Sequence, residues 1–205
     1  MNPNISTVIG ICGISGSGKT TLANAIALAL QDSCIIFWDD FESISEYPPN
    51  YIEWYRNSKD YAAWKTPALA QTLESLKTGK TIICPATNKV LKPTRWVIYD
   101  APLGRNHVET GEHIDYLIFL DTPPDIALAR RLKRDYLSKD IIEKNEVVKE
   151  LDIYINLSRP LFLDIMSLKS EANLVINGEI PIAELVKKVI PSIEQHFSDY
   201  QHKGF

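Results

Sequence analysis

The sequence predicts an α/β fold in which a parallel sheet lies between two layers of helices. Two observations lead to this class: short apolar runs recur without clean polar alternation, and segments with helical spacing separate most of them. Strands that are covered on both faces show such unbroken apolar runs. The alternation of strands with helices favours right-handed crossovers and therefore a parallel sheet.

Five apolar runs are the predicted strands of this sheet. The first ends just before a glycine, and the segment after it carries alanine and leucine at helical spacing, which indicates a strand, a glycine loop and a helix. The predicted core strands span residues 7–12, 34–38, 96–99, 116–120 and 174–176. The predicted helices span residues 19–30, 67–77, 124–138, 141–167 and 180–196.

An excursion of residues 41–94 interrupts the alternation, and we expect it to lie on the substrate side. Within it, residues 81–84 and 89–91 are predicted to pair as a hairpin around Pro85-Ala86-Thr87-Asn88. Packing in a small core is the expected role for most of its aromatic residues, because each ring buries a large apolar area. These aromatic residues are Tyr51, Trp54, Tyr55, Tyr61 and Trp64.

Composition indicates one globular domain. The chain has 205 residues, of which 45% are hydrophobic and 23% charged, and no linker, repeat or low-complexity tract divides it. Residues 1–205 are therefore predicted to form a single domain. The formal charge of -4 offers no general attraction to polyanions, so binding of nucleic acid is not expected.

Neither a signal peptide nor a membrane span is predicted. Met1 to Thr7 lack a basic start, and no run of about 18 apolar residues occurs. Cys12, Cys34 and Cys84 lie in apolar runs without metal-binding spacing, which indicates buried reduced thiols. We expect a cytoplasmic protein without membrane contact, and association into a homo-oligomer stays open.

Residues 13–20 match the pattern Gly-x-x-x-x-Gly-Lys-Ser/Thr between a predicted strand and a predicted helix, the context that this phosphate-binding motif requires. Its glycines let backbone N–H groups turn toward a β-phosphate at a helix N-terminus. Lys19 is predicted to reach the β- and γ-phosphates of ATP, and the Thr20 hydroxyl to ligate Mg²⁺. The alternative is an ordinary glycine-rich turn. The predicted ATP contacts here are Gly13, Ser15, Gly16, Ser17, Gly18, Lys19, Thr20 and Thr21.

Acidic residues end the second and third predicted strands. Asp39 and Asp100 are expected to face the glycine loop, because ligands of open parallel sheets bind at the carboxyl ends of the strands. Phosphoryl transfer needs Mg²⁺ and a carboxylate near the acceptor hydroxyl. Asp39 is the candidate base and metal ligand, and Asp100 the second metal ligand. Each aspartate alone could instead cap a turn or a helix.

A cluster of arginines lies on the predicted helix 124–138. Arg130 and Arg134 are four residues apart, which places them together on a cationic face opposite an apolar stripe. Both are candidate catalytic residues, because phosphoryl transfer uses arginines to stabilise developing charge, and Arg130 is also a candidate ATP contact. Alternatively they are solvated charges, with Asp135 pairing with Arg131.

These motifs together resemble the uridine kinase family of P-loop kinases, which includes phosphoribulokinase-like and nicotinamide riboside kinase-like enzymes. The resemblance covers roughly residues 8–178 and implies a three-layer P-loop NTPase fold. It also implies a core-strand order of 2-3-1-4-5, a lid at residues 128–145 that closes over ATP, and a substrate contact by Arg159. The matching segments are GISGSGKTT at 13–21, Asp39-Asp40-Phe41, Arg130-Arg131 with Arg134-Asp135, and Tyr154 with Arg159-Pro160.

The chain also departs from the family pattern around the acceptor. Lys65 stands where an acid that grips sugar hydroxyls is expected, and the hairpin lacks the family's Tyr and His. Arg105 and His107 follow the third strand in a Pro-x-Gly-Arg-x-His loop. If Lys65, Arg105 and His107 bind the acceptor, it carries negative charge. The alternative is a helix-starting loop with a solvated arginine.

The expected function is an ATP-dependent small-molecule kinase that acts on a hydroxyl of a nucleoside-like or sugar-like metabolite, with Mg²⁺ as cofactor. The alternative is a P-loop ATPase or GTPase-type nucleotide-binding protein without small-molecule kinase activity. A GTPase would need Asp-x-x-Gly after the third strand and Asn-Lys-x-Asp, and neither is complete. An ATP-driven assembly protein would normally carry paired acids after Tyr99, which are missing.

Overall fold

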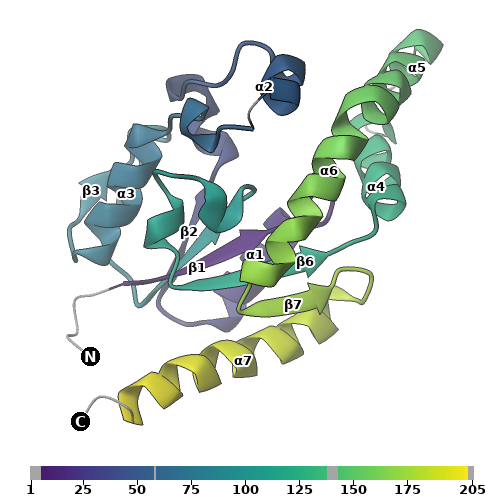
Figure 1. Ribbon diagram of the computed structural model, residues 1–205. Helices are drawn as coiled ribbons and strands as arrows, with labels where there is room; N and C mark the ends of the chain where they lie inside the picture. Colours follow the sequence, from purple (N-terminus) through teal and green to yellow (C-terminus); the bar gives the residue numbers. More distant parts are fainter. Residues whose placement is uncertain (1–5, 58, 138–142, 203–205) are drawn as a thin grey trace.

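A computed structural model describes residues 6–57, 59–137 and 143–202. Its centre is a five-stranded parallel sheet of order β2-β5-β1-β6-β7 (Figure 1). Counted among the core strands alone, this order is 2-3-1-4-5, so the predicted order is confirmed. The strands are β1 (Thr7–Cys12), β2 (Ser33–Phe37), β5 (Trp96–Asp100), β6 (Tyr116–Asp121) and β7 (Leu174–Asn177).

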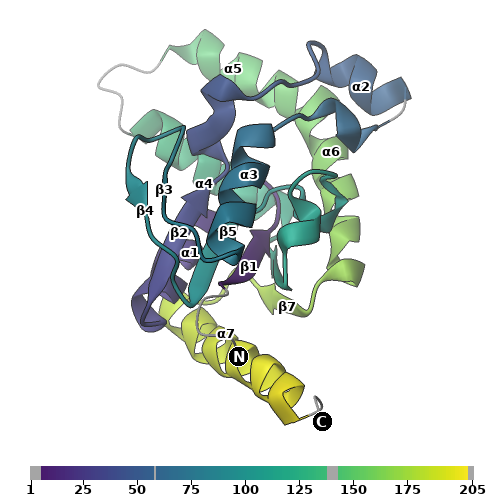
Figure 2. The ribbon, with the colours of Figure 1, turned by 90° about the vertical axis from the view of Figure 1, so that its left-hand side faces the viewer.

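Helices cover both faces of the sheet, as predicted. Helices α1 (Lys19–Ala29) and α7 (Ile182–His202) pack on one face, and α3 (Pro67–Lys77) packs on the other (Figures 1 and 2). Strand β1 shows why its apolar run is unbroken. Ile9 and Ile11 lie in the core under α1 and α7, whereas Val8 and Cys12 lie in the core under α3. A strand with two buried faces has no polar side.

The excursion after β2 forms a layer of short elements. It contains a 3-10 segment (Asp39–Ile44), helix α2 (Tyr51–Asn57), a 3-10 turn (Tyr61–Ala63) and α3. The predicted hairpin is confirmed: β3 (Ile82–Ile83) pairs antiparallel with β4 (Val90–Leu91) beside α3 (Figure 2). Shorter 3-10 turns follow β5 at Gly104–Asn106 and Gly111–His113.

Most of the excursion's aromatic rings pack on one another, as expected, but none of the five is fully buried, so they do not form a core of their own. The rings of Tyr51 and Trp64 stack with centroids 5.3 Å apart, and Trp54 meets Trp64 edge-on at 5.4 Å. Trp54 also meets Tyr61 edge-on, whereas Tyr55 lies under the ammonium group of Lys59. Tyr61 and Trp64 are partly buried against the main core, whereas Tyr51 is 41% exposed.

The segment predicted as one helix over residues 141–167 is not a regular helix. It consists of α5 (Lys144–Ile153), a π-helical turn (Tyr154–Ser158), α6 (Arg159–Ile165) and a 3-10 segment (Met166–Glu171). Tyr154 and Phe162 would point about 80° apart on a regular α-helix. The extra residue in the wider turn brings both into one buried cluster with Ile14 of the glycine loop.

Helix α4 (Pro124–Leu137) lies beside α5 and α6 on the same side of the molecule (Figure 1). The predicted lid over 128–145 starts within α4, and its residues 138–142 lie outside the described residues. All three cysteines are free thiols, with Cys12 and Cys84 buried and Cys34 half-buried. Across the described ranges, no helix is both long and apolar enough to cross a membrane.

Candidate functional site

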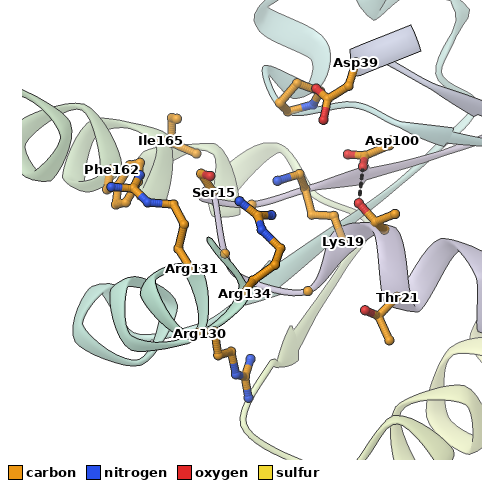
Figure 3. A pocket seen from close by; sticks show the side chains of 15 residues that line it. Ser15, Lys19, Thr21, Asp39, Asp100, Arg130, Arg131, Arg134, Phe162 and Ile165 are labelled. Atoms are coloured by element: carbon orange, nitrogen blue, oxygen red, sulfur yellow. Dashed lines mark hydrogen bonds between the residues drawn. The ribbon is translucent and has the colours of Figure 1, made fainter. Parts of the chain in front are cut away.

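A cavity of about 550 Å³ opens at the carboxyl ends of β1, β2 and β5. Four parts of the chain line it: the glycine loop, the acids after β2 and β5, the arginines of α4, and two apolar side chains of α6 (Figure 3). The predicted loop, acids and α4 arginines therefore meet at one place. The side chains in the lining are Ser15, Lys19, Thr20, Thr21, Asp39, Asp100, Pro102, Arg130, Arg131, Arg134, Phe162 and Ile165.

The glycine loop needs its glycines for steric reasons. Gly13, Gly16 and Gly18 have φ angles of 148°, 84° and 105°, a region that side chains disfavour. A Cβ atom on Gly16 would stand 2.3 Å from the carbonyl oxygen of Ala127. The loop turns tightly, with the Ser17 amide donating to the Ile14 carbonyl at 3.0 Å. Gly16 is therefore required by its close approach to α4, which an ordinary glycine-rich turn would not need.

The residues expected to hold Mg²⁺ fit that ion. The Thr20 hydroxyl donates to Asp100 Oδ2 at 3.1 Å, while Asp100 Oδ1 is buried without a hydrogen-bond partner. Burial raises the pKa of Asp100, Lys19 and Thr20 act in the opposite direction, and Asp39 adds to the rise. A buried carboxylate oxygen without a donor is the kind of ligand that a hard cation satisfies.

Asp39 begins the 3-10 segment after β2 and lies on the same side of the cavity as Asp100, whose pKa its charge helps to raise (Figure 3). Lys19 lies between the loop and these acids, and its ammonium group donates to the Ile14 carbonyl at 3.3 Å. The two strand-end aspartates therefore face the glycine loop with Lys19 between them.

The arginines of α4 diverge, which corrects the prediction that Arg130 and Arg134 lie together. Arg130 donates to the carbonyl oxygens of Ser17 (3.2 Å) and Gly178 (3.0 Å) and points away from Lys19, whereas Arg134 points toward Lys19 (Figure 3). Asp135 pairs with Arg134 at 2.7 Å, while Arg131 pairs with Glu150.

Sequence reasoning missed two parts of this region. Arg131 also lines the cavity, where it pairs with Glu150 of α5 and lies over the Phe162 ring. A second cavity of about 370 Å³ adjoins the first beside Arg130 and is lined by the loop after β7. Gly178 was the available signal, since it follows the last strand at the ligand-binding edge.

Arg105 does not bind at this cavity, so its prediction as a substrate contact is wrong. Its guanidinium donates to the Glu171 carbonyl and to Asn173 Oδ1, both at 2.6 Å, and to the Asp115 carbonyl at 3.4 Å. Asp115 and Asn173 directly precede β6 and β7, at the edge of the sheet opposite the glycine loop. Arg105 is neither a substrate contact nor a solvated charge; it ties two strand starts together.

His107 and Lys65 also lie away from the cavity, which corrects both predictions. His107 is 1% exposed, and its two ring nitrogens contact Thr110 and the Trp64 carbonyl. Lys65 forms an exposed ion pair with Glu46 at 3.4 Å. Neither side chain belongs to the cavity lining, and neither does Arg159, which is exposed at the start of α6.

Replacing Arg105 by alanine is expected to destabilise the fold and to leave the site intact. Hydrogen bonds from a charged donor contribute about 2 kcal/mol, which corresponds to a fall in Tm of roughly 4–8 °C for a chain of this size. Thermal melts and Mg·ADP titration of the same sample measure both effects, with the exposed Arg56→Ala as the matched control. An unchanged Tm combined with weaker acceptor binding would restore the original substrate role.

A parallel sheet of this order, with a glycine loop after its central strand and acids at the neighbouring strand ends, defines a P-loop nucleotide-binding protein. The chain belongs to the AAA domain family, whose model matches residues 9–149. Within this class, the resemblance to uridine kinases rests on curated relatives as well as on motifs.

Three such relatives are uridine kinases or named after them. Uridine kinase-like protein 3 of Arabidopsis thaliana is 27% identical over 208 residues, covering 92% of this chain and 44% of that protein. The uridine kinase of Serratia proteamaculans is 29% identical, with 78% of this chain and 81% of that protein covered. The uridine kinase of Borrelia hermsii is 30% identical, with 62% and 66% covered. These matches confirm the resemblance.

The chain spans less than half the length of this Arabidopsis protein and of a second one, uridine kinase-like protein 5. Among solved structures, shikimate kinase of Aquifex aeolicus matches with a TM-score of 0.49 and 18% identity, covering 93% of this chain and 98% of that one.

Proposed function

We propose that this chain is an ATP-dependent kinase that transfers the γ-phosphoryl group to a hydroxyl group of a small nucleoside-like or sugar-like metabolite. The observation that carries the proposal is one cavity in which the glycine loop and Lys19 face two strand-end carboxylates, Asp39 and Asp100. A phosphate cradle alone would suit any nucleotide-binding protein. The second carboxylate, Asp39, adds the group that a hydroxyl acceptor requires.

The nucleotide would occupy both cavities. Backbone amides of the loop and the start of α1 would hold the phosphates, and the smaller cavity beside Arg130 and Gly178 would take the base and ribose. Thr20, Asp100 and Asp39 would hold Mg²⁺, which neutralises phosphate charge when it is bound. Lys19 and Arg134 would stabilise the charge that develops on the transferred group.

Asp39 would act as the base in the transfer step. The acceptor oxygen forms a bond to the γ-phosphorus while the bond from that phosphorus to the β,γ-bridging oxygen breaks and ADP leaves. The hydroxyl proton passes to the Asp39 carboxylate. Asp39 is suited to this because it is exposed to the cavity, whereas Asp100 is 6% exposed and bound by Thr20.

The acceptor is proposed to be uncharged. The cations that suggested an anionic acceptor, Lys65, Arg105 and His107, all lie elsewhere. Of the cations that do line the cavity, Lys19 and Arg134 are the ones proposed above to bind the transferred phosphoryl group. With Lys19 and Arg134 engaged by that phosphoryl group, the Asp39 carboxylate would repel an anionic acceptor.

A panel assay tests this function. ADP release from Mg·ATP is measured with nucleosides, vitamins and sugars, each beside its phosphorylated form, and Lys19→Ala supplies the background rate. We expect at least one uncharged hydroxyl compound to stimulate release well above background, and its phosphorylated form to fail. Stimulation by phosphorylated compounds alone would contradict the uncharged acceptor. Nucleotide binding without stimulation by any compound would favour a nucleotide-binding protein without kinase activity.

A further inference from the structure

His107 is held in one protonation state by its hydrogen bonds. Its Nε2 lies 2.7 Å from the Trp64 carbonyl oxygen, which only accepts, so Nε2 carries the proton. Its Nδ1 lies 3.2 Å from the Thr110 amide, which only donates, so Nδ1 accepts. The Thr110 hydroxyl, 2.7 Å from Nδ1, receives a hydrogen bond from Tyr99. The imidazole is therefore neutral and fully hydrogen-bonded.

The same ring closes a circuit of contacts that includes the residue before Asp39. His107 meets Trp38 edge-on with centroids 5.0 Å apart, Trp38 stacks with Tyr47 at 6.4 Å, and Tyr47 packs on Trp64 at 5.2 Å. The hydrogen bond from His107 to the Trp64 carbonyl completes the circuit. Trp38 is also the N-cap of the 3-10 segment that Asp39 begins.

Residues 64–66, which lead from the excursion into α3, are held from two sides. Lys65 exchanges two backbone hydrogen bonds of 2.9 Å with Glu46, on the stretch that follows Asp39. The Thr66 amide donates to the Glu109 carboxylate, in the loop that also carries His107. The loop after β5 therefore holds both residues 64–66 and, through Trp38, the start of the segment that carries Asp39.

We propose that His107 is a positioning residue that fixes the excursion, and with it Asp39, relative to the β5 strand end that carries Asp100. Its neutral form closes the circuit between Trp38 and Trp64. The part of this inference that concerns catalysis rests on the proposed kinase function. The part that concerns the placement of residues 38–66 does not.

Acid is expected to open the circuit. Burial lowers the pKa of His107 below its usual value, while the hydrogen bond to Trp64 and the charge of Glu109 act in the opposite direction. Protonated Nδ1 would face the Thr110 amide with two donors opposed. Because the folded pKa is lowered, the stabilisation is complete above the ordinary histidine pKa of 6.5 and is lost as pH falls through the lower folded value.

Hydrogen exchange measures the placement directly. The amides of Trp64, Lys65 and Thr66 are all hydrogen-bonded, so their exchange reports local opening. The His107→Phe variant keeps an aromatic ring but has no hydrogen-bond donor. The side-chain amide of His107→Gln can place an N–H group where Nε2 lies, so it can still donate to the Trp64 carbonyl. We expect the amide exchange rates of residues 61–66 to rise about tenfold in His107→Phe and to be close to the wild-type rates in His107→Gln. His113→Gln, a histidine in the same loop region, is the control.

The wild-type protein should show the same opening as the pH falls below 6.5, after correction for intrinsic exchange, and His107→Gln should not. Unchanged exchange in His107→Phe, or equal opening in the Gln and Phe variants, overturns the proposal.

In the kinase assay His107→Phe should lower kcat about tenfold while Mg·ADP affinity stays within twofold. If exchange changed while kcat did not, His107 would not position Asp39 for catalysis. A wild-type chain without kinase activity would refute the proposed function and leave the exchange result standing.

Discussion

Lys19→Ala is expected to reduce phosphoryl transfer by on the order of 10³-fold, the scale on which a single transition-state donor contributes. The ammonium group projects into the cavity, and its hydrogen bond is to the Ile14 carbonyl of its own loop, not to the core. The fold should therefore survive the change. ADP release and a thermal melt on the same sample test both parts.

Lys187→Ala, an exposed lysine of α7, is the matched control for loss of one positive charge. It should retain wild-type turnover and a wild-type Tm. Near-normal turnover in a folded Lys19→Ala variant would show that the glycine loop does not carry phosphoryl transfer. A large fall in Tm would instead mean that Lys19 supports the loop structurally.

Asp39→Asn is expected to lower kcat by about 10²-fold, because asparagine cannot accept the hydroxyl proton and positioned bases contribute on that scale. The affinity for Mg·ADP should change less, since Thr20 and Asp100 remain. Single-turnover kinetics with the acceptor found in the panel separate the transfer step from product release.

Asp40→Asn tests whether the effect is specific to the side chain that faces the cavity. Asp40 is the next residue in the same 3-10 segment and is exposed, but it does not belong to the cavity lining. We expect it to behave like wild type. If Asp39→Asn weakened Mg²⁺ binding without slowing a saturated transfer step, Asp39 would be a metal ligand and not the base.

The position of the phosphate loop and of the strand-end acids could be predicted from sequence because both depend on local patterns. A glycine loop between an apolar strand and a helix determines its own conformation, as the φ angles of Gly13, Gly16 and Gly18 show. Residues that directly follow parallel strands reach the same edge of the sheet whatever the rest of the chain does. Asp39 and Asp100 were found in this way.

The roles of Arg105 and His107 depend on partners far along the chain. Arg105 binds Glu171 and Asn173, and His107 binds Trp64. A sequence pattern places both residues after β5 but does not show which long side chain turns toward the cavity and which turns into the fold. That choice depends on unpaired carbonyl groups nearby, which buried donors must satisfy.

The direction of side chains on α4 was likewise decided by the tertiary structure. Helical spacing puts Arg130 and Arg134 on one face, yet Arg130 donates to the Ser17 and Gly178 carbonyls and is held away from Lys19, between the two cavities. The sequence by itself determined the sheet, the phosphate loop and the two acids, because backbone geometry and local periodicity specify them. The tertiary structure alone decided which cations reach the site, since flexible side chains follow the acceptors that long-range packing brings near them.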